Sequence, residues 1–211
     1  MGHAMIELFA SAFVTLFVVI DPPGCAPIYA GLTSGADSQH RRAMAIRAAF
    51  IATLILFGFA LFGEALLAAL HIDLDSFRIA GGIMLFIIAL EMVLERRTQR
   101  REERAEKVRA APEIDDVSVF PMAMPMIAGP GAIATIMLLV SRADGVGPTL
   151  VVLGALASVL ALTLVALLAA GRIVQLVGSK VESAVTRLLG VLLAALAAQY
   201  VIDGLKGSFG I

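Results

Sequence analysis

Long apolar stretches alternate with short polar segments along most of this chain. Six of the stretches are long enough, or nearly so, to cross a bilayer hydrocarbon core of about 30 Å. They cover residues 5–33, 48–70, 77–94, 118–140, 149–171 and 184–202. A helix satisfies its own backbone hydrogen bonds in lipid. The pattern therefore predicts an all-α, polytopic membrane protein with six transmembrane helices.

The first and the fourth of these stretches are broken by proline and glycine. The breaks are Ile20-Asp21-Pro22-Pro23-Gly24 and Ala128-Gly129-Pro130-Gly131. Proline lacks a backbone N–H and clashes with the preceding turn, so the carbonyls of Val18 to Ile20 should lose their helical partners. Paired interruptions of this kind mark the binding site in many transporters. We therefore predict a site where the two breaks meet, near the middle of the bilayer.

The breaks fall at matching places in two similar halves. Gly24 and Gly81 are 57 positions apart, and their counterparts Gly131 and Gly190 are 59 positions apart. This spacing divides the chain into a three-helix repeat at 1–94, a charged linker at 95–117 and a second three-helix repeat at 118–211. Each repeat has an odd number of spans, so the second is expected to lie upside-down relative to the first.

The composition supports a membrane protein and suggests its orientation. The chain has 211 residues, of which 60% are hydrophobic and 16% charged, and its mean hydropathy is +0.95. Thirteen of the basic residues lie in 34–47, 95–117 and 172–187, and only three lie on the other side. Cytoplasmic loops carry the excess of Lys and Arg, so both termini are expected outside.

The linker at 95–117 is dense in Arg and Glu. Helical spacing of its charges suggests that it extends the third span as a solvated helix. We interpret it as a cytoplasmic connector that fixes the orientation of the chain. The alternative is a site for anionic lipid or for a partner protein.

Asp21 is the acidic group nearest to a break, and two interpretations of it are open. It could take a proton or hold a substrate ammonium, because acidic residues within the membrane usually have a function. It could instead only cap the helix that follows. Amides at the restarted helices, near Gly24–Ala26 or Gly131–Ile133, are expected to hold a carboxylate. The predicted binding residues are Asp21, Pro22, Pro23, Gly24, Cys25, Ala26, Thr33, Gly129, Pro130, Gly131, Ala132 and Thr135.

Arg78 and Arg187 occupy matching positions near the starts of the third and sixth spans, each three residues before a glycine, Gly81 or Gly190. The two arginines could clamp the opposite half or respond to an anion. The alternative is that they only extend to the membrane interface. We group these four residues as candidate gating or structural positions.

Several kinds of chemistry lack the residues that they need. The single cysteine, Cys25, excludes an intramolecular disulfide, and three dispersed histidines predict no metal site. We find no phosphate loop, dinucleotide fingerprint or nucleophile–base pair. We therefore expect no cofactor, no nucleic acid partner and no enzymatic activity. We expect transport to be driven by a coupling proton or sodium ion, or to occur by passive exchange.

Four segments together resemble the MarC family of bacterial and archaeal inner-membrane proteins. They are Asp21 to Thr33, Phe77 to Phe86, Pro121 to Ala132 and Thr186 to Leu193. The resemblance implies six transmembrane helices, kinship with the LysE-like superfamily and movement of small neutral amino acids such as glycine or alanine. One departure is His71, where the family pattern leads us to expect glycine before the third span.

The leading hypothesis is a secondary transporter of a small neutral or zwitterionic solute that works by alternating access at the two breaks. A second hypothesis is a cargo-free structural or regulatory membrane protein that docks partners through 95–117. A third is cation efflux, for which only Asp21, Thr33 and backbone carbonyls offer oxygen ligands. Scattered glycine and alanine in the last two spans are compatible with a homo-oligomer.

Overall fold

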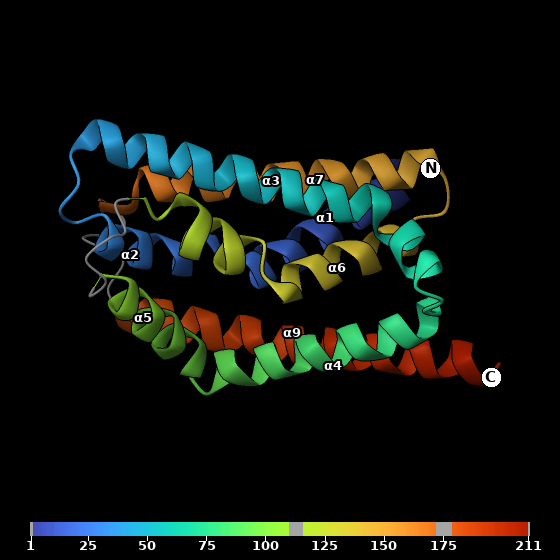
Figure 1. Ribbon diagram of the computed structural model, residues 1–211. Helices are drawn as coiled ribbons and strands as arrows, with labels where there is room; N and C mark the ends of the chain where they lie inside the picture. The colour runs from blue at the N-terminus through green and yellow to red at the C-terminus, as the bar shows by residue number, and fades with distance from the viewer. Residues whose placement is uncertain (1, 110–115, 172–178, 211) are drawn as a thin grey trace.

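The computed structural model describes residues 2–109, 116–171 and 179–210 and is helical throughout (Figure 1). Its elements are α1 (Gly2–Ile20), α2 (Pro22–Leu32), α3 (Ser38–Ala69), α4 (Leu74–Val93), α5 (Arg96–Arg109), η1 (Ser118–Ile127), α6 (Pro130–Ser141), α7 (Val146–Leu168) and α9 (Ser179–Phe209). No strand occurs within these described ranges. Five helices, counting α1 and α2 as one, can cross a membrane, and η1 with α6 makes a sixth if that bent pair is one span. The predicted all-helical membrane architecture is confirmed.

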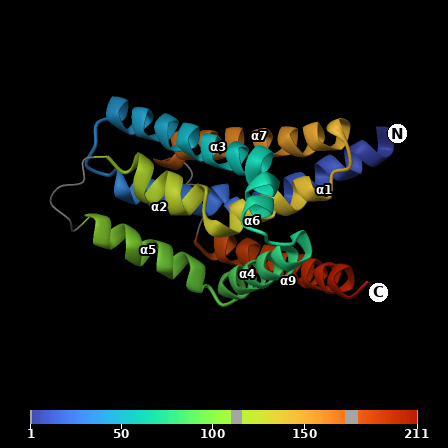
Figure 2. The same ribbon diagram turned by 45° about the vertical axis from the view of Figure 1, so that its right-hand side comes forward.

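Helices of the two halves pack against one another. The first span lies on α7, α3 lies on η1, α6 and α7, and α4 lies along α9 (Figures 1 and 2). The first span of each half thus packs against the second span of the other half, as expected for halves related by a two-fold axis. The upside-down relation of the two halves stays a prediction.

The contact between α4 and α9 depends on glycine. A Cβ atom added at Gly82 would lie 2.9 Å from the carbonyl oxygen of Ala197, and one at Gly190 would lie 3.1 Å from that of Ala89. These neighbours are backbone atoms of the facing helix. Small residues at such positions let two membrane helices approach closely. Gly190, predicted as a structural position, therefore packs the sixth span against the third.

Small side chains lie in the interior of the bundle, and many large apolar side chains lie on its surface, which would face lipid. Ala45, Ala48 and Ala52 of α3 are fully buried against the rest of the bundle. Phe50, Leu54, Phe62 and Leu188 expose 66–69% of their surface. A water-soluble protein rarely exposes a contiguous apolar surface this large, and here a bilayer would cover it.

Both chain ends lie at one end of the bundle (Figure 1). The connection between α2 and α3 and the charged helix α5 lie at the other end. This arrangement agrees with an even number of spans and with the predicted grouping of 34–47 and 95–117 on one side. The remaining basic loop, 172–187, includes residues 172–178, which are outside the described residues, as are linker residues 110–115.

The start of the second span and the course of the linker differ most clearly from the predictions. Helix α3 begins at Ser38, ten residues before the predicted start of that span at 48, because the Asp37 side chain accepts a hydrogen bond from the His40 amide at 2.8 Å and caps the helix. Residues 96–109 of the linker form the helix α5, but this helix does not extend the third span. Glu95 has φ 58°, so the chain turns after α4 and α5 packs against α2 and η1.

Candidate functional site

The first break is a single residue, Asp21, in the left-handed conformation with φ 59° and ψ 64°. The Asp21 amide still donates to the Phe17 carbonyl at 2.9 Å, and the Asp21 carbonyl accepts from the Cys25 amide at 3.0 Å. The helix therefore changes direction little, and Gly2–Leu32 forms one span of 31 residues. The break alters hydrogen bonding more than it alters shape.

The carbonyls of Val18, Val19 and Ile20 lose their helical partners at this break, as predicted, and the Val18 carbonyl does so because residue 22 is proline. In an α-helix the Val19 carbonyl would accept from residue 23, which is proline, and the Ile20 carbonyl would accept from Gly24. The Gly24 amide instead donates to Asp21 Oδ1 at 3.1 Å. The Val19 carbonyl accepts from Arg97 Nη2 at 2.5 Å, and the Ile20 carbonyl accepts from Cys25 Sγ at 3.5 Å.

The amides predicted to hold a carboxylate at this break already have partners. Asp21 caps α2 through the Gly24 amide with its side chain and through the Cys25 amide with its carbonyl. Neither amide is free to bind a solute in this arrangement. Asp21 therefore caps α2, and its carboxylate has a second partner, which is described below.

The second break bends the chain by 51° between η1 and α6. Gly129 is the N-cap residue of α6 and offers no side chain to the first amides of that helix. Pro130 has no N–H, and the Ile133 amide donates to the Gly129 carbonyl at 3.0 Å. The amides of Gly131 and Ala132 have no acceptor in the part of the chain that the structure describes. This helix start keeps the free donors that the first break lacks.

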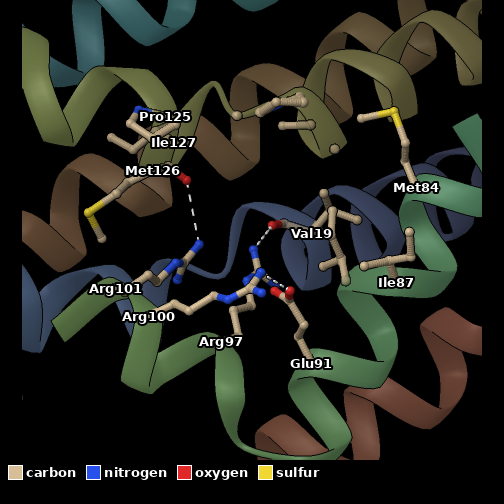
Figure 3. A pocket seen from close by; sticks show the side chains of 15 residues that line it. Val19, Met84, Ile87, Glu91, Arg97, Arg100, Arg101, Pro125, Met126 and Ile127 are labelled. Atoms are coloured by element: carbon tan, nitrogen blue, oxygen red, sulfur yellow. Dashed lines mark hydrogen bonds and ion pairs between the residues drawn. The ribbon is translucent and has the colours of Figure 1, made fainter. Parts of the chain in front are cut away.

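The two breaks meet at one cavity of about 380 Å³ (Figure 3). Val19, in the last turn of α1 before the first break, lines it, and Gly129 to Ala132 line it from the second break. A Cβ atom added at Gly131 would lie 3.7 Å from Val19 Cγ1, which shows how closely the breaks approach. Met84, Ile87 and Ile88 of α4 form an apolar wall.

Charged side chains from α4 and α5 complete the cavity. Arg101 Nη1 pairs with Asp21 Oδ2 at 2.9 Å, and its Nη2 lies 3.5 Å from the Met126 carbonyl, so this one guanidinium joins the two breaks. Arg100 pairs with Glu91. Arg97 contacts the Val19 carbonyl and, at 3.1 Å, the thioether sulfur of Met92 (Figure 3).

These arginines are not among the residues predicted for the site, because the charge pattern of the linker predicts a cytoplasmic connector. The signal was present in the spacing: Arg97 and Arg101 are four residues apart, and Arg100 lies one turn from Arg97, so the three can share one helix face. Burial, and then the charge of Arg101, lowers the pKa of Arg97 to about 10. That value keeps the guanidinium charged at neutral pH.

The structure brings only part of the predicted binding set to the cavity. Gly129, Pro130, Gly131 and Ala132 line it, and Asp21 is connected to it through Arg101. Cys25 and Ala26 are fully buried, and the hydroxyls of Thr33 and Thr135 bond to carbonyls of their own helices. The predicted residues that do not line the cavity are Asp21, Pro22, Pro23, Gly24, Cys25, Ala26, Thr33 and Thr135.

The candidate gating residues lie away from the cavity. Arg78 pairs with Asp75 of its own helix at 2.7 Å. Arg187 reaches the start of the linker, where it pairs with Glu95 at 2.7 Å. Gly81 faces Leu138 of α6.

Long apolar helices and two interrupted spans beside a charged cavity define a polytopic integral membrane protein. The chain belongs to the MarC family: residues 6–209 match the model of the MarC family integral membrane protein. A UPF0056 membrane protein of Methanocaldococcus jannaschii is 34% identical and covers 96% of this chain and 98% of its own. The UPF0056 membrane protein YvbG of Bacillus subtilis is 34% identical, with 97% of each chain covered. No solved structure matches.

Proposed function

We propose that this protein is a secondary transporter of a small neutral or zwitterionic solute, with small amino acids such as glycine and alanine as the leading cargo. The observation that supports this proposal is that one cavity is lined by the second break and by Val19, whose carbonyl loses its helical partner at the first break. In lipid, irregular backbone is tolerated where it lines a cavity or is buried in protein. A solute bound between the breaks would contact both halves of the chain.

The cavity suits such a cargo in size and chemistry. Because a water molecule occupies about 30 Å³ in the liquid, a cavity of about 380 Å³ has room for an amino acid with water around it. The α4 wall offers an apolar surface to a short side chain. Arg97 and the amides of Gly131 and Ala132 offer donors, and Glu91 offers acceptor oxygens.

Alternating access would require the contacts of Arg101 to rearrange. This residue connects Asp21 in the first half with the Met126 carbonyl in the second. Rocking one half against the other would stretch or break these contacts, so the pair is suited to a gate on the side of α5. We place that side in the cytoplasm from the distribution of basic residues.

The two other hypotheses find less support. Cation efflux needs converging oxygen ligands, but the cavity is lined by three arginines, and within the described residues no three His, Cys, Asp or Glu side chains group as a metal site. A docking role for the linker is harder to test than expected. Because α5 supplies cavity residues, replacing the linker would impair transport as well as docking.

The proposal is tested by counterflow in proteoliposomes that contain the full chain. Vesicles loaded with unlabelled glycine or alanine should accumulate the labelled amino acid, and protein-free vesicles should not. A panel of other amino acids, at two pH values, would define the cargo and any coupling to protons. No accumulation of any amino acid by protein that is folded by thermal melting would overturn the assignment.

A further inference from the structure

The charges around the cavity do not balance. Three guanidinium groups line it, those of Arg97, Arg100 and Arg101. The described residues supply two carboxylates to them: Asp21 pairs with Arg101, and Glu91 pairs with Arg100. Arg97 is left with two neutral acceptors, the Val19 carbonyl and the Met92 sulfur.

Arg97 is also incompletely hydrogen-bonded. A guanidinium carries five N–H groups in one plane, and the two bonds of Arg97 use one donor on Nη1 and one on Nη2. Three N–H groups therefore have no acceptor among the side chains and backbone groups that the structure describes. Arg97 is partly buried, and Asp21 and Glu91 act on its charge without pairing with it among the described residues, so an anion in the cavity would be favoured.

The position of Arg97 suits a ligand held between the breaks. Its side chain extends from α5 to the Val19 carbonyl at the first break (Figure 3). The start of α6, where the Gly131 and Ala132 amides are free, lines the same cavity. A small anion there would receive donors from a charged side chain and from a helix start, on two different elements.

We infer that Arg97 binds the carboxylate of the solute that this cavity takes, and that the solute is a small carboxylate or zwitterionic amino acid. The planar fork of arginine matches a carboxylate in a way that the point charge of lysine does not. As a statement about transported cargo, the inference rests on the proposed function. Carboxylate binding itself can be measured without transport.

The experiment compares ligand pairs that differ in the carboxylate. Thermal melting of the purified full chain in detergent is measured with glycine or acetate, and with the matched amides glycinamide or acetamide. The variants are Arg97→Gln, which keeps a donor for the Val19 carbonyl but removes the charge, and Arg97→Lys, which keeps the charge. Arg96→Gln is the control, because Arg96 precedes Arg97 in α5, is exposed and does not line the cavity.

We expect glycine or acetate, and neither amide, to stabilise the wild-type chain and Arg96→Gln. Arg97→Gln should weaken carboxylate binding at least tenfold, and Arg97→Lys should weaken it less. Carboxylate binding without counterflow would reject the transport proposal and leave the role of Arg97 intact. The inference is overturned if no carboxylate stabilises the wild type, if amides act as well as carboxylates, or if Arg97→Gln binds within twofold of the wild type.

Discussion

The Asp21 carboxylate and the Arg101 guanidinium, 80 positions apart in the sequence, lie 2.9 Å apart with about 11% of each side chain exposed. The same carboxylate caps α2 through the Gly24 amide. One acidic side chain thus stabilises the restart of a helix and neutralises a cation brought in by the linker. The two roles can be separated by mutation.

Asp21→Asn should keep the cap and lose the charge, because Asn is a good N-cap residue that also tolerates the left-handed conformation. It leaves Arg101 buried without its counter-ion, which should cost about 3–5 kcal/mol of unfolding free energy. Chemical unfolding in detergent measures this loss. The double variant Asp21→Asn with Arg101→Gln should recover much of it, and a strictly additive double variant would show that the two residues are not coupled.

Asp21 also offers a test of proton coupling. If Asp21 carries a coupling proton, Asp21→Asn should abolish uptake driven by a pH gradient in proteoliposomes and leave exchange at equal pH partly intact. Uptake and counterflow are compared on the same preparation. Unchanged pH-driven uptake would remove Asp21 from any coupling role.

Gly129→Ala should strain the second break. A Cβ atom at this position would overlap the Pro125 carbonyl oxygen, which belongs to the backbone and cannot rotate away. We expect a loss of about 1–3 kcal/mol in unfolding free energy. Gly154→Ala is the matched control in α7: its Cβ would meet nothing within 4 Å, so it should gain up to about 1 kcal/mol from helix propensity. Equal effects of the two variants would contradict the close approach at Gly129.

Asp116 should make stability depend on acid pH. Partial burial by itself raises the pKa of Asp116, but hydrogen bonding to Ser118 and the charges of Arg47 and His40 outweigh it, and the pKa is lowered. Its contribution is therefore complete above the usual aspartate value of about 3.9 and is lost as the pH falls toward the lower folded value. Asp116→Asn should lower the melting temperature slightly at pH 7 and have no effect at the acid end. An equal decrease at both pH values would exclude this origin.

Cys25 can report movement at the first break. It is the single cysteine of the chain and is fully buried, four residues after Asp21. A maleimide should therefore label the folded wild type slowly. Arg101→Gln should accelerate labelling because it releases α5 from the break. Intact-mass spectrometry measures the labelled fraction, with Cys25→Ala as the unlabelled control, and equal rates for the wild type and Arg101→Gln would show that α5 does not shield this region.

Local chemistry made the breaks predictable from the sequence. Pro22 and Pro23 cannot donate, so the release of the Val19 carbonyl follows from proline itself. The glycine that the family pattern suggests in place of His71 also has a physical reason, because His71 has φ 56°, a conformation that glycine adopts without cost.

The partner of the Val19 carbonyl was not predictable in the same way. Arg97 lies 78 positions away, and its approach depends on the turn at Glu95, whose φ of 58° is not marked by glycine. A run of arginines after an apolar span usually indicates a cytoplasmic loop. Only the packing of α5 against α2 and η1 distinguishes a wall of the cavity from a solvated connector.

The segment that tethers one half of the protein to the other also carries the positive charge of the cavity. A displacement between the halves would therefore pull guanidinium groups toward or away from whatever occupies that space. The occupancy of the cavity and the relative position of the two halves would then be thermodynamically linked through a single stretch of main chain. Lengthening that tether, with every lining side chain kept, should weaken the linkage and leave the affinity of the closed form unchanged.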